Sequence, residues 1–101
     1  MDNLEIFSNI EAEAAVLGTI IMNNNYLRRV EDILEPHHFC NAFHGKLYSH
    51  ILITAVEKQV TEINLKEFFA MNEQVGYLKE ILGAASTILD IRQTAQIIVE
   101  A

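Results

Sequence analysis

The chain has 101 residues, half of them apolar, with one proline, four glycines and a single cysteine. This length suits one domain with one hydrophobic core, and the low proline and glycine content argues against long irregular segments. Seven basic against fourteen acidic side chains give a formal charge of −7, and a surface of that sign repels phosphate, so the domain by itself is expected to bind nucleic acid poorly.

The cysteine content and the first residues indicate the compartment. Cys40 has no second cysteine to pair with, so a reducing environment is expected. The N-terminal residues Met-Asp-Asn-Leu-Glu are acidic and lead into no apolar core of a signal peptide. The apolar runs are far shorter than a membrane span. We therefore expect a cytoplasmic protein that contacts no membrane.

Apolar residues recur at helical spacing along nearly the whole chain, which predicts an all-α, compact bundle of about six short helices. The first helix is expected to begin at Ser8 or Asn9, because Ser8 and Glu11 have the spacing of a capping box. Gly18 lies inside this helix and would let a neighbouring helix approach closely. The asparagine run at 23–25 ends it, since asparagine favours caps and turns. The expected buried stripe is Ile10, Ala14, Leu17 and Ile21.

Four further helices are expected before residue 86. The second precedes Pro36, which ends it, and carries Leu27, Val30, Ile33 and Leu34. The third and longest covers residues 42–58. Asn64 is expected to cap the fourth, which contains Phe68–Phe69, one aromatic buried and the other half-exposed. The fifth covers residues 74–85.

The last helix is expected to be capped by Ser86 or Thr87 and to carry apolar residues on two faces. One stripe consists of Ile88, Ile91, Ala95 and Ile98. The second stripe consists of Leu89, Ile97 and Ala101. Because one stripe is enough to dock on a domain this small, the second indicates a helix buried at the centre of the bundle or one shared with a partner. Leu89, Ile97 and Ala101 are therefore the candidate protein-interface residues.

No group of residues predicts catalysis or nucleotide binding. The only Gly-Lys pair, Gly45-Lys46, is followed by leucine where a phosphate-binding loop needs serine or threonine. Glu11 and Glu13 lie two residues apart on one helix, so their carboxylates should face different directions and be solvated. Cys40 lacks an acidic activator and is interpreted as a small buried residue.

Residues 37–44 contain the side-chain types of a zinc site, namely His37, His38, Cys40 and His44. This set defines one alternative, a small zinc-binding protein. A structural zinc site needs a second pair of ligands, however, and adjacent histidines tend to point apart. We expect instead a loop with Cys40 buried and the histidines solvated or capping. No catalytic, cofactor-binding or metal-binding residue is expected in the chain.

One segment resembles a known family. Residues 9–18, Asn-Ile-Glu-Ala-Glu-Ala-Ala-Val-Leu-Gly, resemble the opening of the N-terminal domain of DnaB-type replicative DNA helicases, typically Ser-hydrophobic-Glu-Ala-Glu-x-x-x-Leu-Gly. Cys40 stands where that family usually has tyrosine, and Asn64 where it has aspartate. Further similar segments follow in the family's order: Glu35-Pro36-His37-His38-Phe39, His44-Gly45-Lys46-Leu47-Tyr48, Ile63-Asn64-Leu65, Tyr77-Leu78 with Ile81-Leu82, and Thr94-Ala95 with Ile97-Ile98 and Glu100.

The resemblance implies that residues 1–101 are one DnaB-helicase-like N-terminal domain without catalytic activity, whose last helix leads toward a helical hairpin missing from this chain. In that family the domain belongs to the collar of a hexameric 5′→3′ helicase, helps to assemble the ring from copies of itself, and docks primase and the helicase loader. The ATPase domain, with its ATP, magnesium and single-stranded DNA, is expected outside this chain. A generic helical adaptor or regulatory domain is the other alternative.

Overall fold

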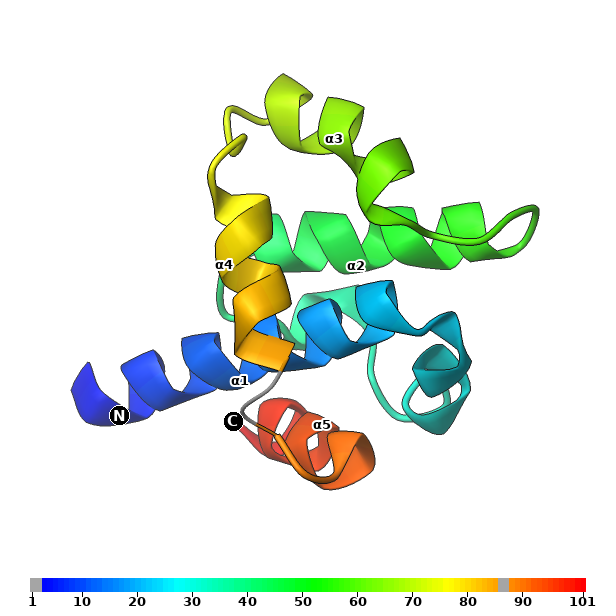
Figure 1. Ribbon diagram of the computed structural model, residues 1–101. Coiled ribbons are helices and arrows are strands. Elements are labelled where there is room, and N and C mark those ends of the chain that lie inside the picture. Colours follow the sequence, from blue (N-terminus) through cyan, green and yellow to red (C-terminus); the bar gives the residue numbers. More distant parts are fainter. Residues whose placement is uncertain (1–2, 86–87) are drawn as a thin grey trace.

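The computed structural model describes residues 3–85 and 88–101, and within them it contains helices and no strand, so the all-α prediction is confirmed. The elements are α1 (Asn3–Met22), η1 (Asn24–Arg29), η2 (Pro36–His38), α2 (Ala42–Ala55), α3 (Glu62–Met71), α4 (Tyr77–Ala84) and α5 (Ile91–Glu100), where η denotes a 3-10 helix. Figure 1 shows α1 running through the middle, with α2, α3 and α4 on one side of it and α5 on the other. No helix in the described part is both long and apolar enough to cross a bilayer.

The central helix is α1, which contacts α2, α4, α5 and η1. Residues such as Leu17 and Ile20 are fully buried, as expected of a helix enclosed on several sides. The helix begins at Asn3, so the prediction that it starts at Ser8 or Asn9 is wrong. No proline or glycine lies between residues 3 and 8 to interrupt a helix, and a capping-box spacing does not by itself start one.

Gly18 allows α1 and α4 to touch backbone to backbone, which confirms its predicted role. A Cβ atom at this position would collide with the carbonyl oxygen of Ile81 and would lie 3.3 Å from the Cβ of Ala85. The absence of a side chain therefore sets the distance between these two helices.

The second predicted helix is a 3-10 helix, η1, followed by a turn. Such helices are used in short pieces, and only ten residues lie between the asparagine run and Pro36. Of the apolar residues that the predicted helix carries, Leu27, Val30 and Leu34 are buried, and Ile33 is half-buried. Asn23 caps η1, as its side chain accepts a hydrogen bond from the Asn25 amide at 3.0 Å.

Asn24 joins the end of α1 to the segment before α3. Its Oδ1 accepts a hydrogen bond from the Val60 amide at 2.6 Å, and its Nδ2 donates to the carbonyl oxygens of Val60 at 2.9 Å and Ile20 at 2.8 Å. An asparagine side chain can satisfy a peptide group in both directions, so this residue holds a connection that has no secondary structure of its own.

The cap of α3 is Thr61, three residues before the predicted Asn64. The two residues form a capping box: Thr61 Oγ1 accepts from the Asn64 amide at 3.2 Å, and Asn64 Oδ1 accepts from the Thr61 amide at 2.9 Å. Of the two aromatic residues in α3, Phe69 is buried and Phe68 is half-buried, as predicted. The predicted helices at 42–58 and 74–85 are shorter, because turns replace their last or first residues.

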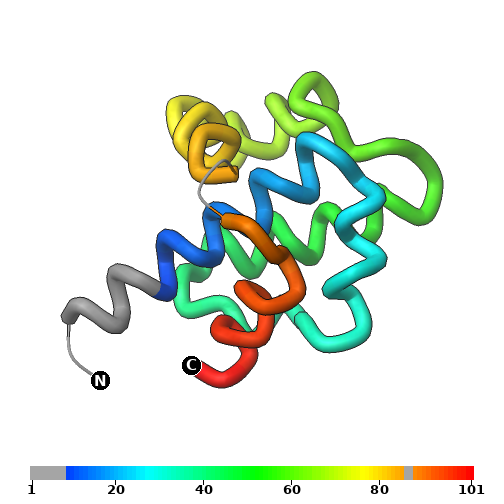
Figure 2. The backbone as a smooth tube through the Cα atoms, turned by 60° about the horizontal axis from the view of Figure 1, so that its bottom comes forward, coloured from blue at the N-terminus to red at the C-terminus, as the bar shows by residue number. Residues whose placement is uncertain are grey.

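One face of α5 packs against α1 and η1. Ile91, Ala95 and Ile98 are buried, so the first predicted stripe is the docking face. The helix is peripheral, as Figures 1 and 2 show, and the interpretation of it as the central helix is wrong. It is capped by Asp90. The caps predicted at 86–87 lie outside the described residues.

Substituting Gly18 tests the contact between α1 and α4. Gly18→Ala should lower the free energy of unfolding by about 1–3 kcal/mol, because the added methyl group forces two backbones apart. Gly83→Ala is the matched control, since a Cβ there meets no atom within 4 Å and alanine favours the helix by about 0.5–1 kcal/mol. Urea denaturation of both variants measures the difference, and equal stabilities would contradict the close-contact account.

Candidate functional site

Three side chains from three helices form a hydrogen-bonded chain inside the protein. The Nδ1 of His44 (α2) lies 2.8 Å from Oε1 of Glu13 (α1), and its Nε2 lies 2.7 Å from the hydroxyl oxygen of Tyr77 (α4). Glu13 and His44 are completely inaccessible to solvent. Burying an ionisable pair is costly unless its geometry is good and its remaining polar atoms are bonded.

The Glu13 carboxylate meets that condition. Besides the His44 ring, it accepts hydrogen bonds from the backbone amides of Cys40 at 2.7 Å and Asn41 at 3.3 Å. All of these partners are N–H groups, so the carboxylate acts only as an acceptor. Nδ1 of the His44 ring faces Glu13, and the other ring nitrogen, Nε2, lies within hydrogen-bond distance of the Tyr77 hydroxyl. No buried side-chain nitrogen or oxygen in the described part of the chain lacks a partner.

The expectation of solvated side chains at Glu13 and His44 is wrong. Glu11 is exposed, as predicted, whereas Glu13 faces the turn at residues 39–41. The donors that make this burial possible lie 27 to 31 positions away, so local spacing cannot reveal them. His38 does cap, since its Nδ1 accepts from the Glu35 amide at 3.0 Å.

Cys40 is exposed, so the prediction of a buried cysteine is also wrong. Its backbone amide donates a hydrogen bond inward to Glu13. Partial desolvation raises the pKa of the Cys40 thiol, and the charge of Glu13 raises it further. The thiol therefore stays protonated at neutral pH, which is unfavourable for a nucleophile.

The structure does not bring the four candidate zinc ligands together. His44 is buried and bonded to Glu13 and Tyr77, and Cys40 lies outside the one nearby cluster of possible ligands among the described residues. That cluster consists of Glu35, His37 and His38, whose potential ligand atoms lie within 4.8 Å of one another. The expectation that the adjacent histidines point apart is wrong, since η2 holds their ring centroids 4.3 Å apart. Nδ1 of His38 is already used by the Glu35 amide, and Glu35 and His37 are exposed.

The Gly-Lys pair is part of a helix. Gly45 lies in α2, where a Cβ atom would come within 2.9 Å of the carbonyl oxygen of Pro36. Gly45 therefore serves helix packing, and Gly45-Lys46 is not placed in a loop that could surround a phosphate.

The second predicted stripe of the last helix lies on the surface. Leu89 is 106% exposed and Ile97 is 52% exposed, and Ala101 is exposed as well. The structure thus separates the two stripes, one against α1 and one toward solvent. The assignment of these three residues to an interface stays a prediction.

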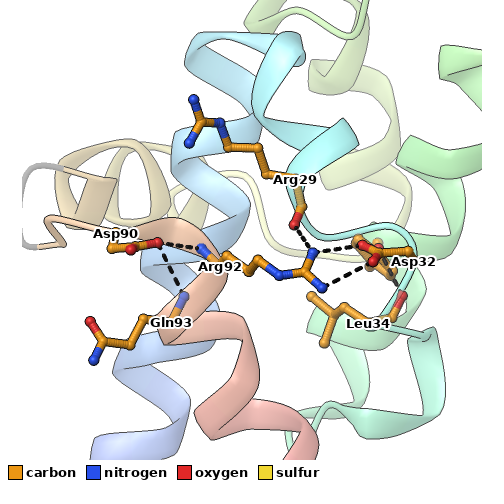
Figure 3. Close-up of polar contacts among 7 residues, drawn as sticks. Arg29, Asp32, Leu34, Asp90, Arg92 and Gln93 are labelled. Atoms are coloured by element: carbon orange, nitrogen blue, oxygen red, sulfur yellow. Dashed lines mark hydrogen bonds and ion pairs between the residues drawn. The ribbon is translucent and has the colours of Figure 1, made fainter.

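An ion pair that the sequence did not reveal sets the orientation of this surface. The Arg92 guanidinium donates to both carboxylate oxygens of Asp32, Nη1 to Oδ1 at 2.9 Å and Nη2 to Oδ2 at 3.0 Å, and Nη1 also donates to the Arg29 carbonyl at 2.8 Å (Figure 3). Asp90 accepts from the amides of Arg92 and Gln93. This two-pronged contact fixes the rotation of α5 on the segment after η1.

The fold and these contacts define a small all-α domain whose buried polar groups serve packing and whose unpacked apolar side chains lie on its surface. Residues 5–100 match the family described as DnaB-like helicase N terminal domain. The chain belongs to this family.

Individual relatives agree with the family match. The chain is 37% identical over 67 residues to the replicative DNA helicase DnaB of Rickettsia bellii, covering 65% of this chain and 14% of that protein. It is 33% identical over 101 residues to the DnaB of Rickettsia prowazekii (88% and 21%) and 30% identical over 99 residues to the replicative DNA helicase DnaC of Bacillus subtilis (91% and 22%). The chain thus spans at most about a fifth of the length of these relatives. No solved structure matches it significantly.

The hydrogen bonds from His44 to Glu13 and Tyr77 join three of the segments that carry the family resemblance. Glu13 belongs to the Glu-Ala-Glu segment, His44 opens His-Gly-Lys-Leu-Tyr, and Tyr77 opens Tyr-Leu. Segments far apart in the sequence therefore meet at one hydrogen-bonded point in the structure.

Removing the charge of Glu13 should destabilise the fold. Glu13→Gln places an amide N–H₂ among N–H donors, so we expect the free energy of unfolding to fall by about 3–5 kcal/mol. Glu11→Gln on the same helix is the control and should change it by no more than about 0.5 kcal/mol, because Glu11 is exposed. Chemical denaturation followed by circular dichroism measures both, and a Glu13→Gln variant as stable as the control would refute the role of the carboxylate.

The ion pair of α5 should make stability depend on acidic pH. Hydrogen bonds from Arg92 lower the pKa of Asp32 below its ordinary value of 3.8. The contribution of the ion pair to the free energy of unfolding is therefore fully present when the pH is above that ordinary value. It is lost as the pH falls through the lower pKa that Asp32 has in the folded state. Thermal unfolding of wild type and Asp32→Asn should differ at neutral pH and converge in strong acid; a difference that persists there would contradict this origin. High salt should also reduce the difference in stability between wild type and Asp32→Asn at neutral pH, since the ion pair is exposed and salt screens it.

Proposed function

We propose that this domain is the non-catalytic N-terminal part of a hexameric replicative DNA helicase. In this role it contributes to ring assembly and docks primase and the helicase loader in the cytoplasm during DNA replication. The observation that carries the proposal is the family match over residues 5–100, together with relatives that are replicative DNA helicases.

The chemistry of the described residues supports a role as a scaffold. The buried ionisable groups bond to one another and to the backbone, and the Gly-Lys pair lies within a helix. The charge of −7 disfavours contact with DNA, which would fall to the motor domain along with ATP and magnesium. Binding would rest on exposed apolar side chains, a few of which dominate the energy of most protein interfaces.

The coding sequence offers one direct test. If the domain belongs to a helicase, codons after residue 101 should encode a helical hairpin and then Gly-x-x-x-x-Gly-Lys-Ser/Thr, the phosphate-binding loop of a motor. A generic helical adaptor would lack that continuation.

Calorimetric titration with the C-terminal domain of the primase from the same organism tests the partner. We expect saturable binding by this chain or by a longer chain that includes the following hairpin. An unrelated helical protein of equal negative charge serves as the control for non-specific attraction. The proposal of primase docking fails if neither the chain nor its longer form binds.

A further inference from the structure

An apolar groove lies between α3 and α4. It has a volume of about 440 Å³, within the range of about 300–1,000 Å³ that is typical of ligand sites. Phe69 and Leu78 line it and are buried, and Val75 lines it and is 71% exposed. A bulky apolar side chain that entered the groove would therefore contact apolar side chains from both sides.

The turn that joins α3 to α4 is a defined helix end. The Glu73 amide donates to the Ala70 carbonyl at 3.1 Å and the Gln74 amide to the Phe69 carbonyl at 2.8 Å, which is the hydrogen-bond pair of a Schellman motif. Glu73 has a φ of 59°, and it is the only residue with positive φ in the described ranges 3–85 and 88–101. Because this turn leads directly into Val75, one end of the groove is fixed before any partner binds.

The residues that line the groove carry more positive than negative charge. Lys66 from α3 and Lys79 from α4 line it, with Glu62 as the acidic lining residue. Both lysines are exposed, and neither has a carboxylate within ion-pair distance in the described part of the chain. The two ammonium groups are therefore available to the carboxylates of a partner.

The neighbouring acidic residues do not line this groove. Glu80 follows Lys79 but lines a different hollow, together with Glu11 of α1. Glu67 follows Lys66, and successive residues point about 100° apart around a helix. On a chain with seven basic and fourteen acidic side chains, this apolar groove thus differs in sign of charge from the surface as a whole.

We infer that the α3–α4 groove binds a short acidic segment of a different protein. A bulky apolar side chain of that segment lies against Val75 and the buried lining, and its carboxylates lie beside Lys66 and Lys79. Charge complementarity carries this choice of partner. A second copy of this chain is a poorer occupant, because two domains with a formal charge of −7 repel each other. The inference rests on the docking role proposed above and deepens it, since it names a surface and the chemistry of the partner.

Titration of the isotope-labelled chain with a short peptide, in which aspartates flank one phenylalanine on both sides, tests the inference by two-dimensional NMR. Wild type should bind saturably, with the largest amide shifts at Ala70, Val75 and Lys79. Lys79→Glu replaces attraction by repulsion and Val75→Asp removes an apolar contact, so each should raise the Kd at least about tenfold. Both positions are exposed, so the remaining spectrum should show an unchanged fold.

Matched controls make the same chemical changes outside the groove. Lys46→Glu and Ile53→Asp replace exposed residues of α2 that do not line it, and both variants should bind the peptide like wild type. A peptide with alanine for phenylalanine, or with lysines for the aspartates, should bind wild type at least about tenfold more weakly. Added salt should weaken binding of the acidic peptide to wild type.

The inference is wrong if wild type shows no saturable binding at millimolar peptide, or if the lysine peptide binds as well as the acidic one. It is also wrong if Lys79→Glu and Val75→Asp bind like their controls. Sedimentation of the chain without peptide adds a further outcome: self-association that Lys79→Glu and Val75→Asp abolish would assign the groove to a second copy instead. None of these results bears on the coding sequence after residue 101 or on primase binding by the wild-type chain, so a failure here is distinguishable from a failure of the proposed function.

Discussion

A carboxylate removed from water needs donors on every side, and the fold of this domain is arranged around that requirement at Glu13. Its partners are the backbone amides of residues 40 and 41 and the ring of His44, which in turn bonds to Tyr77. These groups come from α1, the turn before α2, α2 itself and α4. Since a half-satisfied buried charge is more costly than none, the four segments are held in one relative arrangement.

The close contact of α1 with α4 follows from the same arrangement. Tyr77 stands at the start of α4 and reaches His44, while Gly18 lets the other end of α4 lie against the backbone of α1. Burial raises the pKa of Tyr77, and the charges of Glu80 and Glu13 raise it further, so the hydroxyl keeps its proton and can donate to His44. The hydrogen bond of Tyr77 at its start and the backbone contact with Gly18 further along together position this short helix.

The periphery of the molecule is organised differently. Because α5 docks with one stripe only, its rotation depends on the Arg92–Asp32 pair and on the cap at Asp90. That rotation turns Ile97 outward, and Leu89, which precedes the helix, is exposed as well. Apolar side chains that remain exposed on the surface are consistent with the proposed role of the domain in binding other proteins.

The sequence predicted features that depend on nearby residues better than features that depend on residues far apart in the chain. Helical periodicity records which side of a segment is apolar, so the all-α class and the docking stripe of α5 could be predicted. The close approach at Gly18 followed from a glycine inside a helix, and the sequence also predicted that one residue of the Phe68–Phe69 pair is buried. Helix ends were less certain, as at Asn3 and Thr61, because several residues near each end are able to cap. Spacing gave no information on Glu13, His44 or Arg92, whose partners lie 27 to 63 positions away. Only the packing of the helices decided whether each of these side chains is solvated or bonded to another protein group. The free-energy cost of burying a charged or polar group depends on whether it finds such a partner.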